Sequence, residues 1–189
     1  MKMAKKLLAV VLTGVMAVSM LTGCASISSH QVADELETML HTANTKATVK
    51  AVDSDLANDA VKAAKTTDGK FKAEATLKAD VKTALSKDNT DKYVWYTYFA
   101  AKDMKKADKA QKIVEKIVTT TSGSATINTT GAVNSSDVKV GTKTGAAIKA
   151  GDKYELSMKE FTVKETDSNN KTTSVDYIMI VVTCKAVEA

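Results

Sequence analysis

Apolar side chains between residues 29 and 85 recur at intervals of three and four positions, which is the period of an amphipathic helix. The pattern predicts helices over about 29–43, from Asp53 or Ser54 to Ala64, and over Glu74–Leu85. The residues just before the third helix also alternate like a strand, but its alanine, lysine and leucine content favours a helix. The first two apolar faces contain Val32, Leu36, Met39, Leu40 and Ala43, then Leu56, Ala57, Ala60, Val61 and Ala64.

An aromatic run lies in the middle of the chain. The segment Tyr93–Phe99 holds five of the nine aromatic residues. It leads into a stretch in which apolar residues share one helical side and lysines occupy the other. The spacing predicts one helix from about Thr90 to Val118. The lysines of this stripe are Lys102, Lys105, Lys106, Lys109, Lys112 and Lys116.

After Thr119 the chain changes to short Thr/Val/Ile runs separated by glycine, which is typical of strands and turns. The clearest β signal is a pair of strands, Tyr154–Lys164 and Ser174–Val187. They are joined by a polar turn at residues 166–170, where Asn and Asp tolerate left-handed backbone.

The side-chain parity of these two strands predicts two further features. In the first strand the apolar residues lie at even positions up to Met158 and at odd positions from Phe161, so a regular strand would place the two groups on opposite faces. An extra residue would bring them to one face, which predicts a bulge near Lys159–Glu160. In the last strand both parities are apolar, which predicts a central strand covered on both faces. Helices must supply at least one of these covers.

The order of elements predicts an α+β fold, with three or four amino-terminal helices packed on a carboxyl-terminal antiparallel sheet of three to five strands. The order of helices followed by a long final hairpin loosely resembles the cone-shaped nuclear-transport-factor-2-like domains. The alternative is a separate helical bundle followed by a small β-sandwich.

The amino terminus carries a signal of a different kind. Three lysines, Lys2, Lys5 and Lys6, precede an uninterrupted weakly polar to apolar run from Leu7 to Leu21. A helix of that length reaches roughly 22 Å, which is short of a bilayer core of about 30 Å. The arrangement is therefore typical of an export signal peptide rather than of a permanent span.

The residues that follow, Leu21-Thr22-Gly23-Cys24, resemble the lipobox of bacterial lipoproteins. The resemblance implies that Leu21, Thr22 and Gly23 are recognised by a dedicated signal peptidase. It also implies that the Cys24 thiol receives diacylglycerol and becomes the first residue of the mature protein. Two acyl chains hold a protein durably on a membrane, whereas a single chain gives marginal binding.

The lipobox resemblance and the pattern of elements together set the expected organisation of the chain. The chain comprises a signal peptide over residues 1–23, a lipidated tether over 24–29, a helical part over 30–120 and a β-rich part over 121–189 that forms one domain with the helices. Loss of 23 residues leaves 166, and loss of three lysines lowers the formal net charge from +5 to +2. A lipidated Cys24 has no thiol to pair with Cys184, so we expect no disulfide within the chain.

Composition and missing motifs exclude several classes of function. All 27 basic residues are lysine, and arginine is the side chain best suited to guanine edges and phosphates, so we expect no nucleic-acid partner. The P-loop, the Rossmann glycine pattern, the zinc-binding HExxH motif and the serine nucleophile elbow are all missing from the sequence. We therefore predict no catalytic residues, no metal site and no cofactor.

Four sets of residues are candidates for chemistry. Tyr93, Trp95 and Tyr96 could form a stacking platform for sugars or peptidoglycan fragments. They could instead form the core between helix and sheet. The core is favoured, because on a helix these rings would be spread around most of the circumference, which indicates burial on several sides. The lysine stripe could dock on anionic headgroups or could simply be a solvated helix face. Cys184 is expected to be a buried, inert thiol among apolar neighbours. His30 and His41 lie too far apart to share a metal, and Glu37 is spaced to pair with His41.

These observations predict a lipid-anchored binding or interaction protein on the extracytoplasmic side of the bacterial cell envelope. The alternatives are an envelope hydrolase with a site in a cone-shaped pocket, and a structural envelope subunit. A deep pocket with convergent polar groups would favour the enzyme, whereas a filled sheet would favour binding or structure.

Lipidation of Cys24 is directly testable. We expect metabolic labelling with a radioactive fatty acid to mark the protein, and Cys24→Ala to abolish the label and release the chain from the membrane fraction. Cys184→Ala is the matched control, because it removes the other cysteine and should leave the label intact. An unlabelled wild-type protein, or membrane retention of Cys24→Ala, would contradict the assignment.

Overall fold

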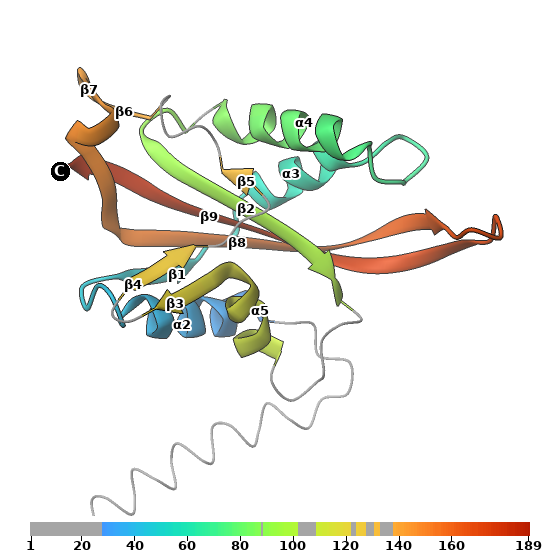
Figure 1. The fold of residues 1–189 in the computed structure, drawn as a ribbon, viewed down its shortest axis with the longest axis horizontal. Helices are drawn as coiled ribbons and strands as arrows, with labels where there is room; N and C mark the ends of the chain where they lie inside the picture. The colour runs from blue at the N-terminus through green and yellow to red at the C-terminus, as the bar shows by residue number, and fades with distance from the viewer. Residues whose placement is uncertain (1–27, 88, 102–108, 122–123, 128–130, 133–137) are drawn as a thin grey trace, which may run out of the picture.

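A mixed sheet of five strands, in the order β1-β8-β9-β2-β5, organises the described part of the chain (Figure 1). The computed structural model describes residues 28–87, 89–101, 109–121, 124–127, 131–132 and 138–189. The sheet strands are β1 (Thr48–Ala51), β2 (Lys92–Ala100), β5 (Gly131–Ala132), β8 (Ile148–Thr166) and β9 (Thr172–Glu188). Two small ribbons pair β3 (Val118–Thr121) with β4 (Ser124–Ile127) and β6 (Lys139–Val140) with β7 (Lys143–Thr144).

Helices cover both faces of this sheet (Figure 1). Helices α2 (Ser29–Leu40) and α5 (Lys109–Ile117) lie on one face together with the β3–β4 ribbon, and α3 (Leu56–Ala64) and α4 (Glu74–Ser86) lie on the other. A 3-10 turn, Gly145–Ala147, leads into β8.

This arrangement of helices and strands confirms the predicted α+β class. The alternative of a helical bundle followed by a separate sandwich is wrong, because β1 and β2 belong to the same sheet as β8 and β9.

The β8–β9 hairpin forms the centre of the sheet, as the sequence predicts. Its strands pair in continuous antiparallel register from Tyr154 opposite Cys184 to Thr166 opposite Thr172. The connecting turn contains Asn170 at a φ of 59°, a left-handed conformation that asparagine tolerates better than most residues. On its other side β9 pairs antiparallel with β2, and β8 pairs parallel with β1.

The two apolar parities of β9 fill two separate cores. Ile178, Ile180 and Val182 contact the α2/α5 layer, whereas Met179 and Val181 contact the α3/α4 layer. These five side chains are at most 1% exposed. The prediction of a central strand covered on both faces is therefore confirmed, and helices supply both covers.

The predicted bulge near Lys159–Glu160 is wrong. Pairing through that region is regular, and the register shift lies between Ala150 and Tyr154. The apolar set changes parity after Met158 because the strand changes the face on which it is covered: Met158 packs against the α2/α5 core, and Phe161 belongs to the α3/α4 core. No extra residue is needed where both faces are covered.

The predicted helix from Thr90 to Val118 is also wrong in its first part. Residues 92–100 form strand β2, and the helical character begins, among the described residues, at Lys109. Aromatic and β-branched residues favour strands. Here, alternate side chains of β2 enter the two cores, with Val94 and Tyr96 on one face and Phe99 on the other.

The ambiguous segment before α3 becomes an edge strand that α2 covers. The Val49 backbone N–H donates to Oε2 of Glu37 over 2.7 Å, and His41 Nε2 donates to the Ala47 carbonyl over 2.6 Å. Glu37 and His41 were expected to pair with each other on the helix surface. Instead, both bind the backbone of the β1 segment on the side away from β8, which blocks that edge against pairing with another strand.

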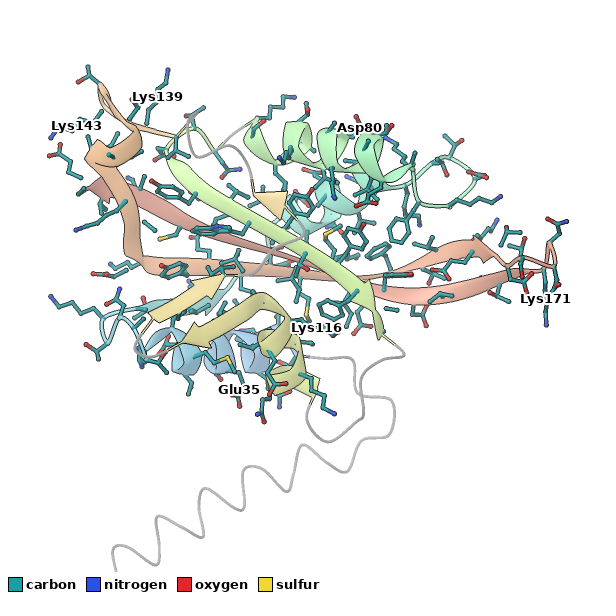
Figure 2. The ribbon with its side chains drawn as sticks, in the orientation of Figure 1. Glu35, Asp80, Lys116, Lys139, Lys143 and Lys171 are labelled. Carbon is teal, nitrogen blue, oxygen red and sulfur yellow. The ribbon has the colours of Figure 1, made fainter. Side chains whose placement is uncertain are left out.

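Removing this contact should destabilise the protein. Glu37→Ala leaves the nearly buried Val49 N–H without its acceptor, so we expect the free energy of unfolding to fall by about 1–2 kcal/mol, measured by urea denaturation. Glu37→Gln retains an acceptor oxygen and should recover most of that loss. Glu35→Ala on the same helix is the matched control, because Glu35 points away from the sheet (Figure 2). Equal losses in Glu37→Ala and Glu35→Ala would contradict the role of the contact.

Candidate functional site

Three aromatic rings form a row across the sheet on its α2/α5 face. Tyr93 and Trp95 come from β2, and Tyr154 comes from β8. The ring centroids of Tyr93 and Trp95 lie 5.8 Å apart with planes 14° from parallel, and those of Trp95 and Tyr154 lie 6.3 Å apart at 28°. The three rings thus stack side by side, and we refer to them as the aromatic row.

The sheet register builds the aromatic row. Tyr93 of β2 and Tyr154 of β8 both pair with Cys184 of β9, so the thiol lies between the two tyrosines on the same face. Trp95 is one pleat further along β2. All three rings are partly buried: Trp95 and Tyr154 border the α2/α5 core, and Tyr93 borders a small cluster of Val138, Ile148 and Ala186.

The sequence predicted this group only in part. Tyr93 and Trp95 do lie together and retain some exposure, but Tyr96 points to the opposite face and is 1% exposed in the α3/α4 core. Tyr96 is therefore a core residue rather than a platform residue, because successive side chains of a strand point to opposite faces of the sheet. Tyr154 was missed, since the pairing of β2 with β9 that brings Trp95 beside it cannot be read from local spacing.

The Cys184 thiol is held in its neutral form. It is 1% exposed, and its Sγ donates to the Gly151 carbonyl over 3.3 Å. Burial raises the pKa of Cys184 to about 11 and the pKa of the neighbouring Tyr154 to about 12. Because the thiolate is the nucleophilic form, a thiol with this pKa is unreactive near neutral pH.

A second aromatic cluster lies on the opposite face, near the α3–α4 connection. Phe71 contacts Tyr98, Phe161 and Tyr177 at centroid distances of 5.2, 6.0 and 4.9 Å. The Tyr177 hydroxyl donates to the Glu165 carboxylate. These rings pack on one another and join the α3/α4 core, so they hold α3, α4 and the hairpin together.

The lysine stripe is described in part. Its first three members, Lys102, Lys105 and Lys106, lie outside the described residues, as does the Lys109 side chain. Lys116 is exposed, and its Nζ lies 5.8 Å from the centroid of the Phe99 ring, a cation–π distance. Lys112 is partly buried.

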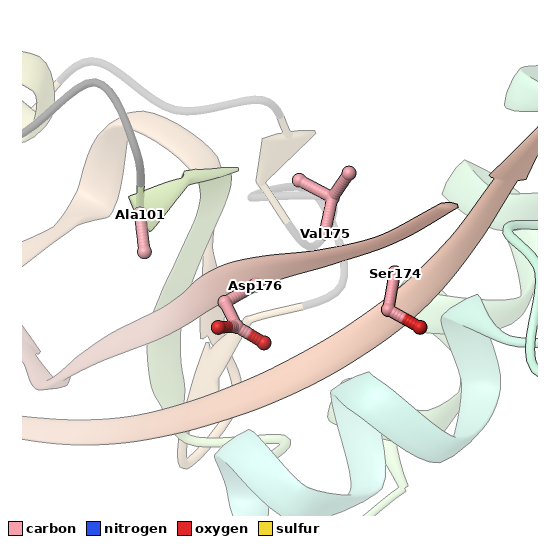
Figure 3. Close-up of a pocket in the computed structure, with 4 residues that line it drawn as sticks. All are labelled: Ala101, Ser174, Val175 and Asp176. Carbon is pink, nitrogen blue, oxygen red and sulfur yellow. The ribbon is translucent and has the colours of Figure 1, made fainter. Parts of the chain in front are cut away.

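Elsewhere in the described part of the chain, polar groups do not converge on a reaction centre. A hollow of about 400 Å³ opens between the end of β2 and the start of β9, lined by Ala101, Ser174, Val175 and Asp176 (Figure 3). Its single carboxylate, Asp176, accepts a hydrogen bond from Thr162 Oγ1 over 2.8 Å. Among the residues that the structure describes, no three His, Cys, Asp or Glu side chains are grouped so that they could hold a metal ion.

Cys24 and its expected recognition residues, Leu21, Thr22 and Gly23, lie outside the described residues. Within residues 28–189, as far as these are described, no helix is long and apolar enough to cross a bilayer.

Comparison with known proteins adds no relative. No family model matches the sequence, and no curated protein or solved structure is significantly similar to it. The assignment of a site therefore depends on the residues and geometry of this chain.

The Cys184 pKa predicts a pH dependence of stability. The unfolded thiol ionises near pH 9 and the folded thiol near pH 11. Burial of the neutral thiol therefore contributes stability that is complete below about pH 9 and is lost as the pH rises towards 11. We expect the free energy of unfolding of the wild type to fall over this interval more steeply than that of Cys184→Ser. The serine hydroxyl does not titrate there, and burial, which is the largest cause of the raised pKa of Tyr154, is common to both proteins. Parallel pH profiles would contradict the assignment.

Proposed function

We propose that this chain is a lipid-anchored binding or interaction protein on the extracytoplasmic side of the bacterial cell envelope. Its location is supported by the ordered sequence of lysines, apolar run and Leu21-Thr22-Gly23-Cys24. Its binding role is supported by one structural observation, the partly exposed aromatic row of Tyr93, Trp95 and Tyr154.

The chemistry of the row fits a ligand with flat, weakly polar faces. Stacked tyrosine and tryptophan rings offer broad apolar surface, and their polar groups can bind substituents at the rim. The Tyr93 hydroxyl donates to the Ile148 carbonyl over 3.4 Å, so towards a ligand it serves as an acceptor. Sugar rings present such a combination, with C–H groups on their faces and hydroxyls at their edges. Glycan strands of the cell wall are therefore the ligand class that we assign to the row.

A surface role fits the structure better than catalysis in a pocket. Helices cover both faces of the sheet, so the described residues form no cone-shaped pocket of the kind that the enzyme alternative requires. The hollow at Asp176 has one carboxylate and a hydroxyl, and general acid–base chemistry on a glycosidic bond uses a pair of carboxyl groups.

Trp95 is the single tryptophan, so its fluorescence reports on the aromatic row directly. We expect soluble glycan strands released from peptidoglycan to shift the Trp95 emission saturably when added to the mature protein in detergent micelles. Tyr154→Ala removes one stacked ring and should weaken binding about tenfold, which corresponds to about 1.4 kcal/mol.

The control is Tyr98→Ala, which removes a partly buried tyrosine from the opposite face of the sheet. It should leave the glycan affinity unchanged. No saturable change in the wild type, or equal weakening in both variants, would overturn the glycan assignment. Membrane attachment is tested separately by the fatty-acid labelling of Cys24.

A further inference from the structure

The β8–β9 hairpin extends beyond the rest of the sheet as a two-stranded arm (Figure 1). Pairing of β1 with β8 ends at Leu156, and pairing of β2 with β9 ends at Ala100 opposite Tyr177. We define the arm as residues 162–166 of β8, residues 172–176 of β9 and the turn between them. At about 3.3 Å per residue each of its strands reaches roughly 16 Å.

The outer edge of β8 in the arm is occupied by the α3–α4 connection. The Lys164 backbone N–H donates to the Gly69 carbonyl over 2.9 Å, and Lys65 Nζ donates to the Thr162 carbonyl over 2.9 Å. The exposed Lys159 and Lys164 side chains on this strand discourage pairing further, as charged residues do on edge strands.

The outer edge of β9 in the arm is different. Lys164 lies opposite Ser174, and the Lys164 N–H points away from β9 to Gly69. This is consequently a non-hydrogen-bonded pair of the antiparallel ladder, so the Ser174 N–H and carbonyl also point away from β8. By the same alternation, the backbone groups of Thr172 and Asp176 point to the outer edge.

Nothing in the described part of the chain pairs with this edge before Tyr177. The stretch Thr172–Asp176 contains no lysine, proline or glycine and shows no bulge, so apart from the charge of Asp176 it lacks the usual protections of an edge strand. The hollow lined by Ala101, Ser174, Val175 and Asp176 opens beside it, in line with the end of β2 (Figure 3).

We propose that Thr172–Asp176 is a strand-pairing site for a second copy of this chain. Two copies pair antiparallel about a two-fold axis centred on Ser174. Ser174 of one copy then lies opposite Ser174 of the other, and Thr172 lies opposite Asp176. All three have outward backbone groups, so the pairing forms up to about six backbone hydrogen bonds.

The side chains of this stretch suit pairing with itself. Thr, Ser and Val are small or β-branched residues that favour strands, and threonine–threonine or threonine–serine neighbours stabilise adjacent strands. The single charge, Asp176, faces a threonine hydroxyl rather than a like charge, which would be destabilising.

The two-fold axis is also compatible with attachment of both copies to one membrane, a point that depends on the proposed lipid anchor. An axis perpendicular to the joined sheet keeps the α2/α5 layers of the two copies on the same side. Each chain enters this layer at Ser29, the first residue of α2. Both lipidated tethers can therefore reach a single bilayer, where confinement to a surface favours association.

Ser174→Pro tests the proposal without disturbing the arm itself. Proline removes the outward N–H, which β8 does not use, and prolines are tolerated on edge strands in this position. We expect the mature protein in excess detergent to sediment as a dimer, Ser174→Ala to remain dimeric, and Ser174→Pro to dissociate at least about tenfold more readily. A circular dichroism spectrum that matches that of the wild type shows that the fold of Ser174→Pro is intact, whereas its melting temperature would also reflect the loss of association.

Crosslinking in intact membranes provides the second measurement. Ser174→Cys should form covalent dimers with a short bis-maleimide, whereas Thr83→Cys on the exposed face of α4 should not. A monomeric wild type, equal dimerisation of Ser174→Pro, or equal crosslinking of the two cysteine variants would each overturn the proposal. A dimer that carries no fatty acid would remove the anchor and leave the strand pairing intact.

Discussion

Burial of both faces of β9 is the constraint on which the rest of the structure depends. A strand with apolar side chains on both faces needs a cover on each side. The chain supplies one cover with α2, which precedes β1, and α5, which follows β2, and the other with α3 and α4, which lie between β1 and β2 in the sequence. The neighbours of β9 follow from the same requirement. Both β2 and the middle of β8 also contribute side chains to the two cores, so the sheet is filled rather than hollow.

This filled architecture determines what kind of function the chain can offer. Apolar residues that would line a pocket in an open sheet are used to attach helices, which leaves the ends and edges of the strands for contacts with other molecules. The aromatic row lies where the α2/α5 core gives way to the smaller cluster around Ile148, and the unprotected edge lies where β2 stops short of the hairpin turn. Both features are boundaries of the core, which is why they retain exposed surface.

The sequence predicted those elements whose pattern is local. The helices at Ser29, Leu56 and Glu74 and the terminal hairpin follow directly from periodicity and turn chemistry. The segment 92–100 was assigned to a helix because it leads directly into the amphipathic stretch that carries the lysine stripe. Its pairing with β9, a contact distant in sequence, makes it a strand instead. For the same reason Tyr154 was missed as a neighbour of Trp95, and the Glu37 contact with β1 could not be read from helix spacing.

The position of β9 in the chain also has a consequence for biogenesis. Strand β9 follows both of its partners, β2 and β8, along the chain, and each of them loses one neighbour without it. The central part of the sheet therefore cannot form from the residues before Thr172 alone, because the pairing of distant strands must wait for this segment. A growing polypeptide that still lacks β9 leaves the apolar faces of its helices without their partner, which exposes them to aggregation until the hairpin closes.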